Sequence, residues 1–333
     1  MSTPTAPVVS DPASLFAEIP GMLGFYPESS IILLCLDKND SSRFSLGPVI
    51  RADLTDAETL CEAPIVADII LTLVVSDEEE DDFLVDEAVM VLLEAEALPI
   101  EGIWHVPAIA QEERVTLLWG ADTVPDEWAE GGTIPAIFAT NTMRDSLNKG
   151  ALLSENREHA LGHFDREQLP DSRRAAIEAD IDSRTSAMVK AEDQGVGAGA
   201  VQSLVADLRG MLANGDRDDH ALALLLFMLG GASALRDLAL GEVIEASDTG
   251  ATLALAAARY ALTDRQRANA LCLFALSSTN ASGAIALTVS AGENPAHSLT
   301  SLLRRMNAER GLAEAIPAVM RGVGMTRATY GIS

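Results

Sequence analysis

The strongest constraint on the fold is a change in the spacing of apolar residues near position 133. Before it, apolar residues form short continuous runs, as within residues 30–36 and 68–75. Such runs, bounded by turn residues, are typical of strands buried on both faces of a sheet. After it, β-branched runs vanish and apolar residues recur every three or four positions, which is the period of an amphipathic helix. The chain therefore combines a part with a sheet and a helical part.

We expect the first part to be an α/β domain with a mixed sheet over residues 15–132, preceded by a flexible leader over residues 1–14. Asp11 is a candidate N-cap for the first helix. Polar residues between the first two strands favour an antiparallel hairpin. The apolar stripe of one helix, which is the face expected to pack on the core, consists of Phe83, Val89, Met90, Leu92 and Leu93. The expected elements are helices at 15–23 and 83–97 and strands at 30–36, 44–54, 68–75, 100–109 and 115–119.

We expect an all-helical region over residues 133–325, with neighbouring helices antiparallel and a flexible, glycine-rich joint near 192–199. The segments that begin at Asp216 and Asp264 show a weak similarity, like that of an internal repeat, which predicts tetratricopeptide-like helical hairpins. An ordinary helical bundle is the alternative, because it uses alanine-rich faces equally well. The expected helices lie at 155–169, 173–189, 201–212, 218–229, 251–261, 265–277, 281–291 and 297–309.

Acidic residues dominate the charge, since 50 Asp and Glu stand against 23 Lys and Arg, a net charge of −27. This charge repels the phosphates of nucleic acids and anionic membranes, so neither is an expected partner. We expect the excess to be spread along both halves, with one dense run at residues 77–82. That run is expected to complement the dipole of the following helix, and its attraction for cations or a basic partner is secondary.

Cysteine usage and the N-terminus indicate a cytoplasmic protein. Cys35, Cys61 and Cys272 lie in or beside apolar runs, at spacings that fit neither a disulfide framework nor a zinc site, so we expect buried thiols. The N-terminus lacks the basic and apolar regions of a signal peptide. The longest apolar run, residues 221–229, is shorter than the ~20 residues of a membrane span.

Three short motifs point to chemistry, but each has a structural interpretation that fits better. The glycines of residues 195–199 resemble a dinucleotide-binding loop, yet a charged helix precedes them instead of a strand. Asp37 begins a pattern like that of a calcium loop, but Ser42 stands where the loop requires glycine. His159 and His163 stand four apart on an expected helix, which leaves metal binding open, although a solvated face is the favoured interpretation.

Four segments carry a resemblance to a known family. They read Leu-Phe-Ala-Glu-Ile-Pro at 15–20, Leu-Gly-Phe-Tyr-Pro-Glu-Ser-Ser at 23–30, Arg-Ala-Asp-Leu at 51–54 and Leu-Ser-Glu-Asn-Arg at 153–157. In these segments the chain resembles the actinobacterial family of domain of unknown function 4192. The resemblance implies an intracellular protein with an N-terminal α/β part and a C-terminal helical part, and it implies no activity.

The sequence contains no Gly-x-Ser-x-Gly, Cys-plus-His or phosphate-loop signature, which favours a non-catalytic interaction, scaffold or regulatory module. Its negative charge would recruit a basic protein by electrostatic steering. The alternative is a small-ligand-binding protein or an enzyme with its site at the strand ends, where open α/β sheets bind ligands. We expect neither a cofactor nor a metal. The candidate ligand-site residues are Tyr26, Asp37, Arg51, Asp53, Asp77 and His105.

Overall fold

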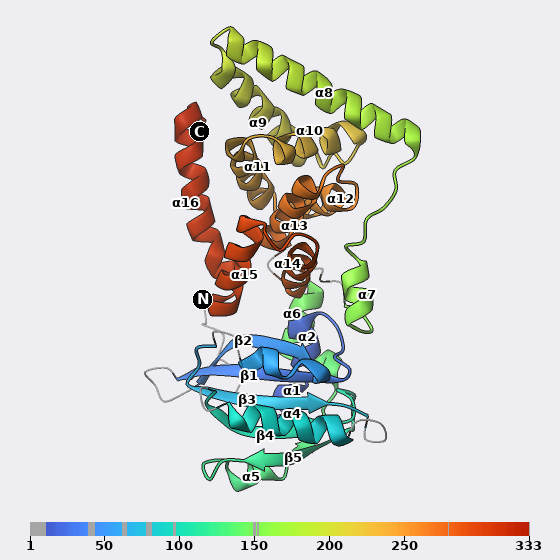
Figure 1. Ribbon diagram of the computed structural model, residues 1–333, viewed down its shortest axis with the longest axis vertical. Helices are drawn as coiled ribbons and strands as arrows, with labels where there is room; N and C mark the ends of the chain where they lie inside the picture. The colour runs from blue at the N-terminus through green and yellow to red at the C-terminus, as the bar shows by residue number, and fades with distance from the viewer. Residues whose placement is uncertain are drawn as a thin grey trace. The chain divides into compact units, whose positions relative to one another are not determined.

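The computed structural model describes residues 11–38, 44–61, 65–77, 82–95, 98–148, 151, 153–278 and 280–332. The chain forms two compact units, unit 1 (Met1–Ala160) and unit 2 (Leu161–Ser333). Unit 1 holds a mixed sheet and unit 2 is helical, which confirms the expected fold class (Figure 1). Among these described residues, no helix is long and apolar enough to cross a membrane.

Unit 1 is built on a six-stranded sheet with the order β2-β1-β3-β4-β5-β6. β3 and β4 are parallel, and the other neighbours are antiparallel, including the expected β1–β2 hairpin. The continuous apolar runs of β1 and β3 correspond to burial on both faces of the sheet. The strands are β1 (Ser30–Lys38), β2 (Phe44–Asp53), β3 (Ile69–Val75), β4 (Ile100–Val106), β5 (Arg114–Gly120) and β6 (Gly132–Thr133).

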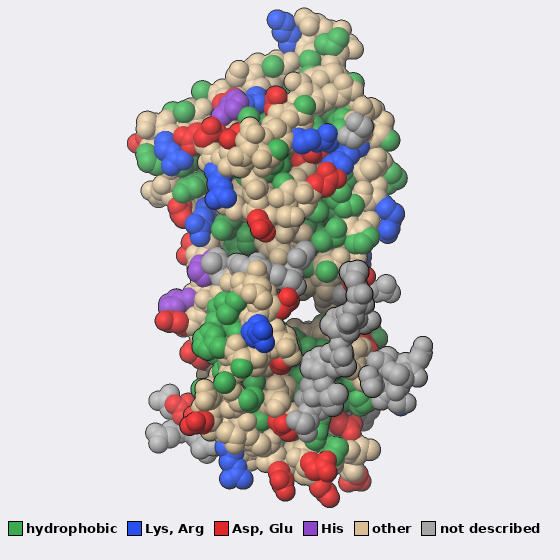
Figure 2. All heavy atoms as spheres, turned by 180° about the vertical axis from the view of Figure 1, so that it is seen from behind, with side chains coloured by type: hydrophobic (Ala, Val, Ile, Leu, Met, Phe, Trp, Pro, Cys, Tyr) green, Lys and Arg blue, Asp and Glu red, His purple; other side chains and the backbone are tan. Residues whose placement is uncertain are grey.

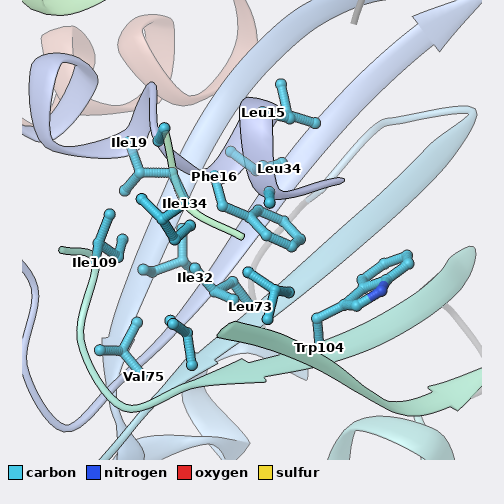
Figure 3. Packing of buried hydrophobic residues seen from close by; sticks show 14 of the residues in the cluster. Leu15, Phe16, Ile19, Ile32, Leu34, Leu73, Val75, Trp104, Ile109 and Ile134 are labelled. Carbon is cyan, nitrogen blue, oxygen red and sulfur yellow. The ribbon is translucent and has the colours of Figure 1, made fainter. Parts of the chain in front are cut away.

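One face of the sheet is covered by α1 (Pro12–Phe16) and α2 (Ile19–Leu23). Asp11 caps α1 as expected, because its carboxylate accepts the Ser14 N–H at 2.7 Å. Phe16 and Trp104 pack in the core beneath these helices, with ring centroids 5.7 Å apart (Figure 3). Of the expected leader, residues 1–10 lie outside the described residues, and α1 begins at Pro12.

A side-chain cap ties the segment after residue 133 to unit 1. The Glu18 carboxylate accepts the backbone N–H groups of Asn141 at 3.2 Å and Thr142 at 2.8 Å, at the start of α6 (Asn141–Asn148). A carboxylate here satisfies free N–H groups and complements the helix dipole. The segment 133–160 thus belongs to unit 1, whereas the sequence placed it in the helical region. It also contains η2 (Ile137–Ala139) and the start of α7 (Arg157–Gly162).

The opposite face of the sheet is covered by α4 (Asp82–Glu94), the crossover between β3 and β4 (Figure 1). Ala88 and Leu92 are buried in the cluster formed with Ile31, Leu33 and Ile103 of the strands. The short elements η1 (Leu54–Asp56) and α3 (Glu58–Cys61) contact α4, and α5 (Asp126–Ala129) follows β5.

Unit 2 surrounds a central helix, α13, in which residues 266–276 are all buried. The expected helical hairpins are present, but α13 contacts α10, α11, α12, α14, α15 and α16, whereas each hairpin of a solenoid contacts its neighbours alone. The helices are α8 (Asp171–Asp193), α9 (Gly197–Asn214), α10 (Asp219–Gly230), α11 (Ser233–Glu245), α12 (Ser247–Arg259), α13 (Asp264–Ser278), α14 (Ala281–Glu293), α15 (Ser298–Arg310) and α16 (Leu312–Tyr330).

Two helices of unit 2, α11 and α16, were not expected from the sequence. Charged residues interrupt the apolar pattern of α11, and one of them, Glu242, is buried because it pairs with Arg209 at 2.8 Å and Arg327 at 2.7 Å. α16 contains Pro317, which is normally read as a break. The expected joint near 192–199 is a short turn between α8 and α9 in which Gly195 has a φ of 73°.

Candidate functional site

The strand register places four of the six candidate residues at one end of the sheet. Ser30 at the start of β1 pairs with Asp53 at the end of β2 and with Val75 at the end of β3, and Val74 pairs with His105. Arg51, Asp53, Asp77 and His105 therefore lie at this end. Asp37 pairs with Ser45 near the far end of β1. The structure thus separates Asp37 from the others.

The residues at this end lie on opposite faces of the sheet. Side chains alternate along a strand, and Val49 and Ile32 belong to the cluster beneath α1 and α2. Arg51 and Ser30 share that face. His105 shares the opposite face with Ile103, beneath α4. Arg51 and His105 therefore do not converge on one site.

Arg51, near the end of β2, is held in place beside the start of β1. Its Nε donates to Ser30 Oγ at 2.9 Å, and Nη2 forms an ion pair of 2.6 Å with Asp53 Oδ1. The Ser30 hydroxyl in turn donates to the Glu28 carbonyl at 2.5 Å. The Arg51 side chain is 9% exposed and that of Asp53 is 43% exposed, so the carboxylate is the accessible member. Arg157 lies 3.7 Å from Asp53 on its outer side.

Three of the four segments that carry the family resemblance meet at this place, which we call the corner (residues 24–30, 51–54 and 153–157). The Ser154 N–H donates to the Gly24 carbonyl at 3.0 Å, and the Tyr26 N–H donates to the Ser154 carbonyl at 3.4 Å. Tyr26 packs against the adjoining core, and its burial raises the pKa of the phenol above the usual value. The corner is thus one local structure assembled from three distant parts of unit 1.

Backbone conformation at the corner is unusual at two positions. Gly24 ends α2 with a φ of 80°, the left-handed C-cap that its sequence predicts. Ser29 has a φ of 39°, a region that costs a non-glycine residue roughly 1–2 kcal/mol. Strained backbone of this kind tends to occur at binding sites. The corner is therefore a candidate for a small-ligand site.

His105 contacts one hydroxyl. Its Nε2 lies 3.0 Å from Ser76 Oγ and 3.0 Å from the Ser76 carbonyl, and both residues are buried. In the described part of the chain, no carboxylate contacts the other ring nitrogen. A hydrolytic serine requires such an orienting group. The contact is therefore explained by the packing of two neighbouring strand ends.

Both units carry an excess of acidic residues, as expected, but most of the excess lies in unit 1. Unit 1 has 30 acidic and 7 basic residues, whereas unit 2 has 20 acidic and 16 basic residues. Residues 52–113 include 18 Asp and Glu and no Lys or Arg. Figure 2 shows the contrast on one face, with acidic side chains predominating over unit 1 and both signs interspersed over unit 2.

The outer face of α4 combines this charge with exposed apolar side chains. Phe83 is 77% exposed and Met90 is 56% exposed. The expectation that these two residues face the core was wrong. At 100° per residue both lie about opposite Ala88, the buried residue that faces the sheet, and a helical projection would have placed them on the outer face.

Comparison with protein-family models decides the family. The model described as "Domain of unknown function (DUF4192)" matches residues 12–313. The chain belongs to this family. The corner and α4 both lie within the matched region of this DUF4192 protein. Comparisons with curated proteins and with solved structures give no match.

Two thiols of the DUF4192 chain are unsuited to nucleophilic chemistry. Burial, and to a smaller extent the charge of Asp37, raises the pKa of Cys35 to about 11. Burial raises the pKa of Cys272 to about 12. A nucleophilic cysteine needs a lowered pKa and access to solvent. Cys35 and Cys272 are both free thiols.

The described residues of the DUF4192 chain include no group of three or more His, Cys, Asp or Glu side chains placed to hold a metal. His159 lies 3.5 Å from Glu155 on an exposed helix face, and His163 follows the end of α7. Of the acidic run 77–82, residues 78–81 lie outside the described residues.

Proposed function

We propose that this protein is a non-catalytic interaction module that recruits a basic protein or segment inside the cell through unit 1. The observation that carries the proposal is the stretch 52–113, which forms much of unit 1 and includes no Lys or Arg. A surface of one sign attracts a partner of the opposite sign and accelerates the encounter. The near balance of acidic and basic residues in unit 2 assigns the recruiting role to unit 1.

Two further observations support a non-catalytic, intracellular role. The Ser76–His105 contact has no orienting carboxylate within the described residues, and two thiols have raised pKa values. The free thiols of Cys35 and Cys272 suit a reducing compartment, where disulfides are rare.

The proposal is tested with the full chain and labelled peptides of equal length, one rich in lysine and arginine and one rich in glutamate. Fluorescence anisotropy at about 0.02 M and about 0.2 M salt separates electrostatic binding from other binding, because added salt screens exposed charges. We expect the basic peptide to bind and to lose at least tenfold in affinity at the higher salt, and the acidic peptide not to bind. Absence of binding by the basic peptide at low salt would overturn the proposal.

A pull-down from an actinobacterial lysate at both salt concentrations complements the peptide experiment. Proteins retained by electrostatic attraction should carry basic segments and elute as salt rises. A pull-down that retains nothing reproducibly at either concentration contradicts the proposed function.

The corner favours a second candidate function, small-ligand binding. Arg51 is fixed in place by Ser30 and Asp53, and Ser29 holds strained backbone beside it. A thermal-shift screen of nucleotides, metals and charged metabolites tests this candidate. A true ligand should stabilise the natural chain more than the Arg157→Gln variant, in which the half-exposed arginine of the corner is removed. A screen that shows no shift leaves this candidate without support.

A further inference from the structure

α4 has one face that packs on the sheet and one that packs on nothing in the described structure. Its buried side is formed by Ala88 and Leu92. Phe83 and Met90 point the other way and are 77% and 56% exposed. They are seven residues apart, which is two helical turns, or about 10 Å along the axis. A surface helix normally carries polar residues on its solvent face, so two large apolar side chains there need a cause.

Carboxylates flank these apolar side chains. Asp86, Glu87 and Glu94 are exposed on the same outer half of α4. None of the three forms an ion pair with a described residue, and the chain offers no Lys or Arg between residues 52 and 113. The outer face of α4 is therefore an apolar strip bordered by unneutralised negative charge.

We propose that the outer face of α4 (Phe83, Asp86, Glu87, Met90 and Glu94) is the docking site for a basic amphipathic helix of a partner protein. The apolar side of that helix packs on Phe83 and Met90, and its Lys or Arg residues face the three carboxylates. The proposal deepens the proposed function, on which it rests, by naming the surface and the kind of segment that binds.

Geometry and charge both favour this occupant. Anchors two turns apart match the i and i+7 positions of a partner helix that lies along α4. Apolar anchors supply binding energy, and flanking charges select a basic sequence.

A second copy of this chain fits the face poorly. In a symmetric contact the same patch lies on both sides, so the three carboxylates would face their own copies. Like charges across an interface oppose association. An anionic membrane is disfavoured for the same reason.

The experiment uses the full chain and a labelled lysine–leucine peptide with its leucines at helical spacing, with a scrambled peptide of equal composition as the reference. The double variant Phe83→Ser/Met90→Ser removes the anchors and leaves the charge unchanged. The triple variant Asp86→Asn/Glu87→Gln/Glu94→Gln removes the charge and leaves the anchors. All five side chains lie on the solvent face, so both variants should keep the thermal midpoint of the natural chain.

Two matched controls distinguish docking on α4 from non-specific binding to exposed apolar or acidic side chains. Phe138→Ser removes an apolar side chain that is 66% exposed elsewhere in unit 1. The variant Asp182→Asn/Asp207→Asn/Asp248→Asn removes three exposed charges from unit 2 and thus matches the net charge of the triple variant.

We expect the amphipathic peptide to bind the natural chain at least tenfold more tightly than the scrambled peptide. The anchor variant and the α4 charge variant should each weaken this binding by about tenfold, and the charge variant should flatten its dependence on salt. Hydrogen exchange should slow over residues 82–95 in the complex. Both control variants should bind like the natural chain.

Equal binding of the two peptides, or unchanged binding by the anchor variant, would overturn the docking proposal. In that case the proposed function stands, because basic peptides still bind elsewhere on unit 1. If neither basic peptide binds the natural chain at low salt, the proposed function itself fails.

Discussion

Replacing Arg267 with methionine tests how unit 2 is held together. Arg267 lies in the central helix α13 and is 1% exposed. Its guanidinium donates to Glu293 through Nε and Nη2, to the Ala258 carbonyl at 2.8 Å and to the Phe164 carbonyl at 2.7 Å. It therefore joins α12, α14 and the segment after α7. Methionine retains most of the apolar stem and supplies no donor.

The expected cost follows from what the substitution leaves behind. Breaking a buried ion pair costs about 3–5 kcal/mol when the remaining charge stays buried. Glu293 is partly exposed and regains water, which lowers this cost. Each carbonyl left without a donor costs about 1–3 kcal/mol, and the burial of methionine offsets part of the total. We expect a net loss of about 3 kcal/mol in the free energy of unfolding.

Urea unfolding followed by far-ultraviolet circular dichroism measures this loss, because most helices lie in unit 2. With a slope of about 1–3 kcal/mol per molar urea, a loss of about 3 kcal/mol should lower the midpoint by about 1–3 M. All three tryptophans lie in unit 1, so their fluorescence monitors that unit separately.

The matched control is Arg174→Met, which removes an exposed arginine that pairs with Glu178 within α8. Exposed pairs of this kind contribute less than about 0.5 kcal/mol. If the dichroism midpoint of Arg267→Met equals that of Arg174→Met, the reasoning about the buried guanidinium is refuted.

Three further predictions concern single groups. Glu18→Gln weakens the cap of α6 and should lower the stability of unit 1 by about 1–2 kcal/mol, measured by tryptophan fluorescence in urea; an unchanged midpoint would contradict the capping role. The pKa of His297 is lowered by burial and by the charges of nearby arginines. As the pH falls, the unfolded chain therefore takes up this proton at a higher pH than the folded chain does. The stability of unit 2 should therefore fall as pH drops below about 6.5, and a His297→Asn variant should lack that component of the pH dependence. Cys35 and Cys272 should resist iodoacetamide at neutral pH until urea unfolds the chain, and mass spectrometry of the modified protein would expose any early reaction.

The sheet could be predicted from the sequence because its central strands leave little choice. A nearly continuous apolar run such as residues 69–75 suits a strand that is covered on both faces of a sheet, because an element with a solvent-exposed face would carry polar residues. The positive φ of Gly24 was predictable as well, because Pro27 prevents continuation of α2. These features depend on local rules that hold in any tertiary context.

The helical region was harder to predict because tertiary pairing changes what can be buried. Glu242 looks like a solvent-facing residue, yet two arginines from other helices allow it to lie in the interior. α11 was missed for this reason, since a buried carboxylate breaks the apolar pattern that marks a helix. α16 contains Pro317 in its interior, where proline is disfavoured, so tertiary packing again overrides a local preference.

The candidate site shows a different limit. The sequence grouped Asp37, Arg51, Asp53 and Asp77 at strand ends, but it could not tell which end of the sheet each strand end forms, and Asp37 lies at the other end from Arg51 and Asp53. It could not assign faces to these residues, since a shift of one residue in register moves a side chain to the other face. The pairing of β1 with β2 and β3 supplies that register.

The central position of α13 limits how this protein can vary in length. Since helices that are distant in sequence all pack on α13, removing α14 to α16 would expose a helix that is apolar over residues 270–276. A helical hairpin added after α16 would find no free side of α13 on which to pack. Repeat proteins lengthen by duplicating a unit, but here each helix has one fixed place. Insertions among relatives should therefore concentrate in the connections, and the set of helices around α13 should stay constant.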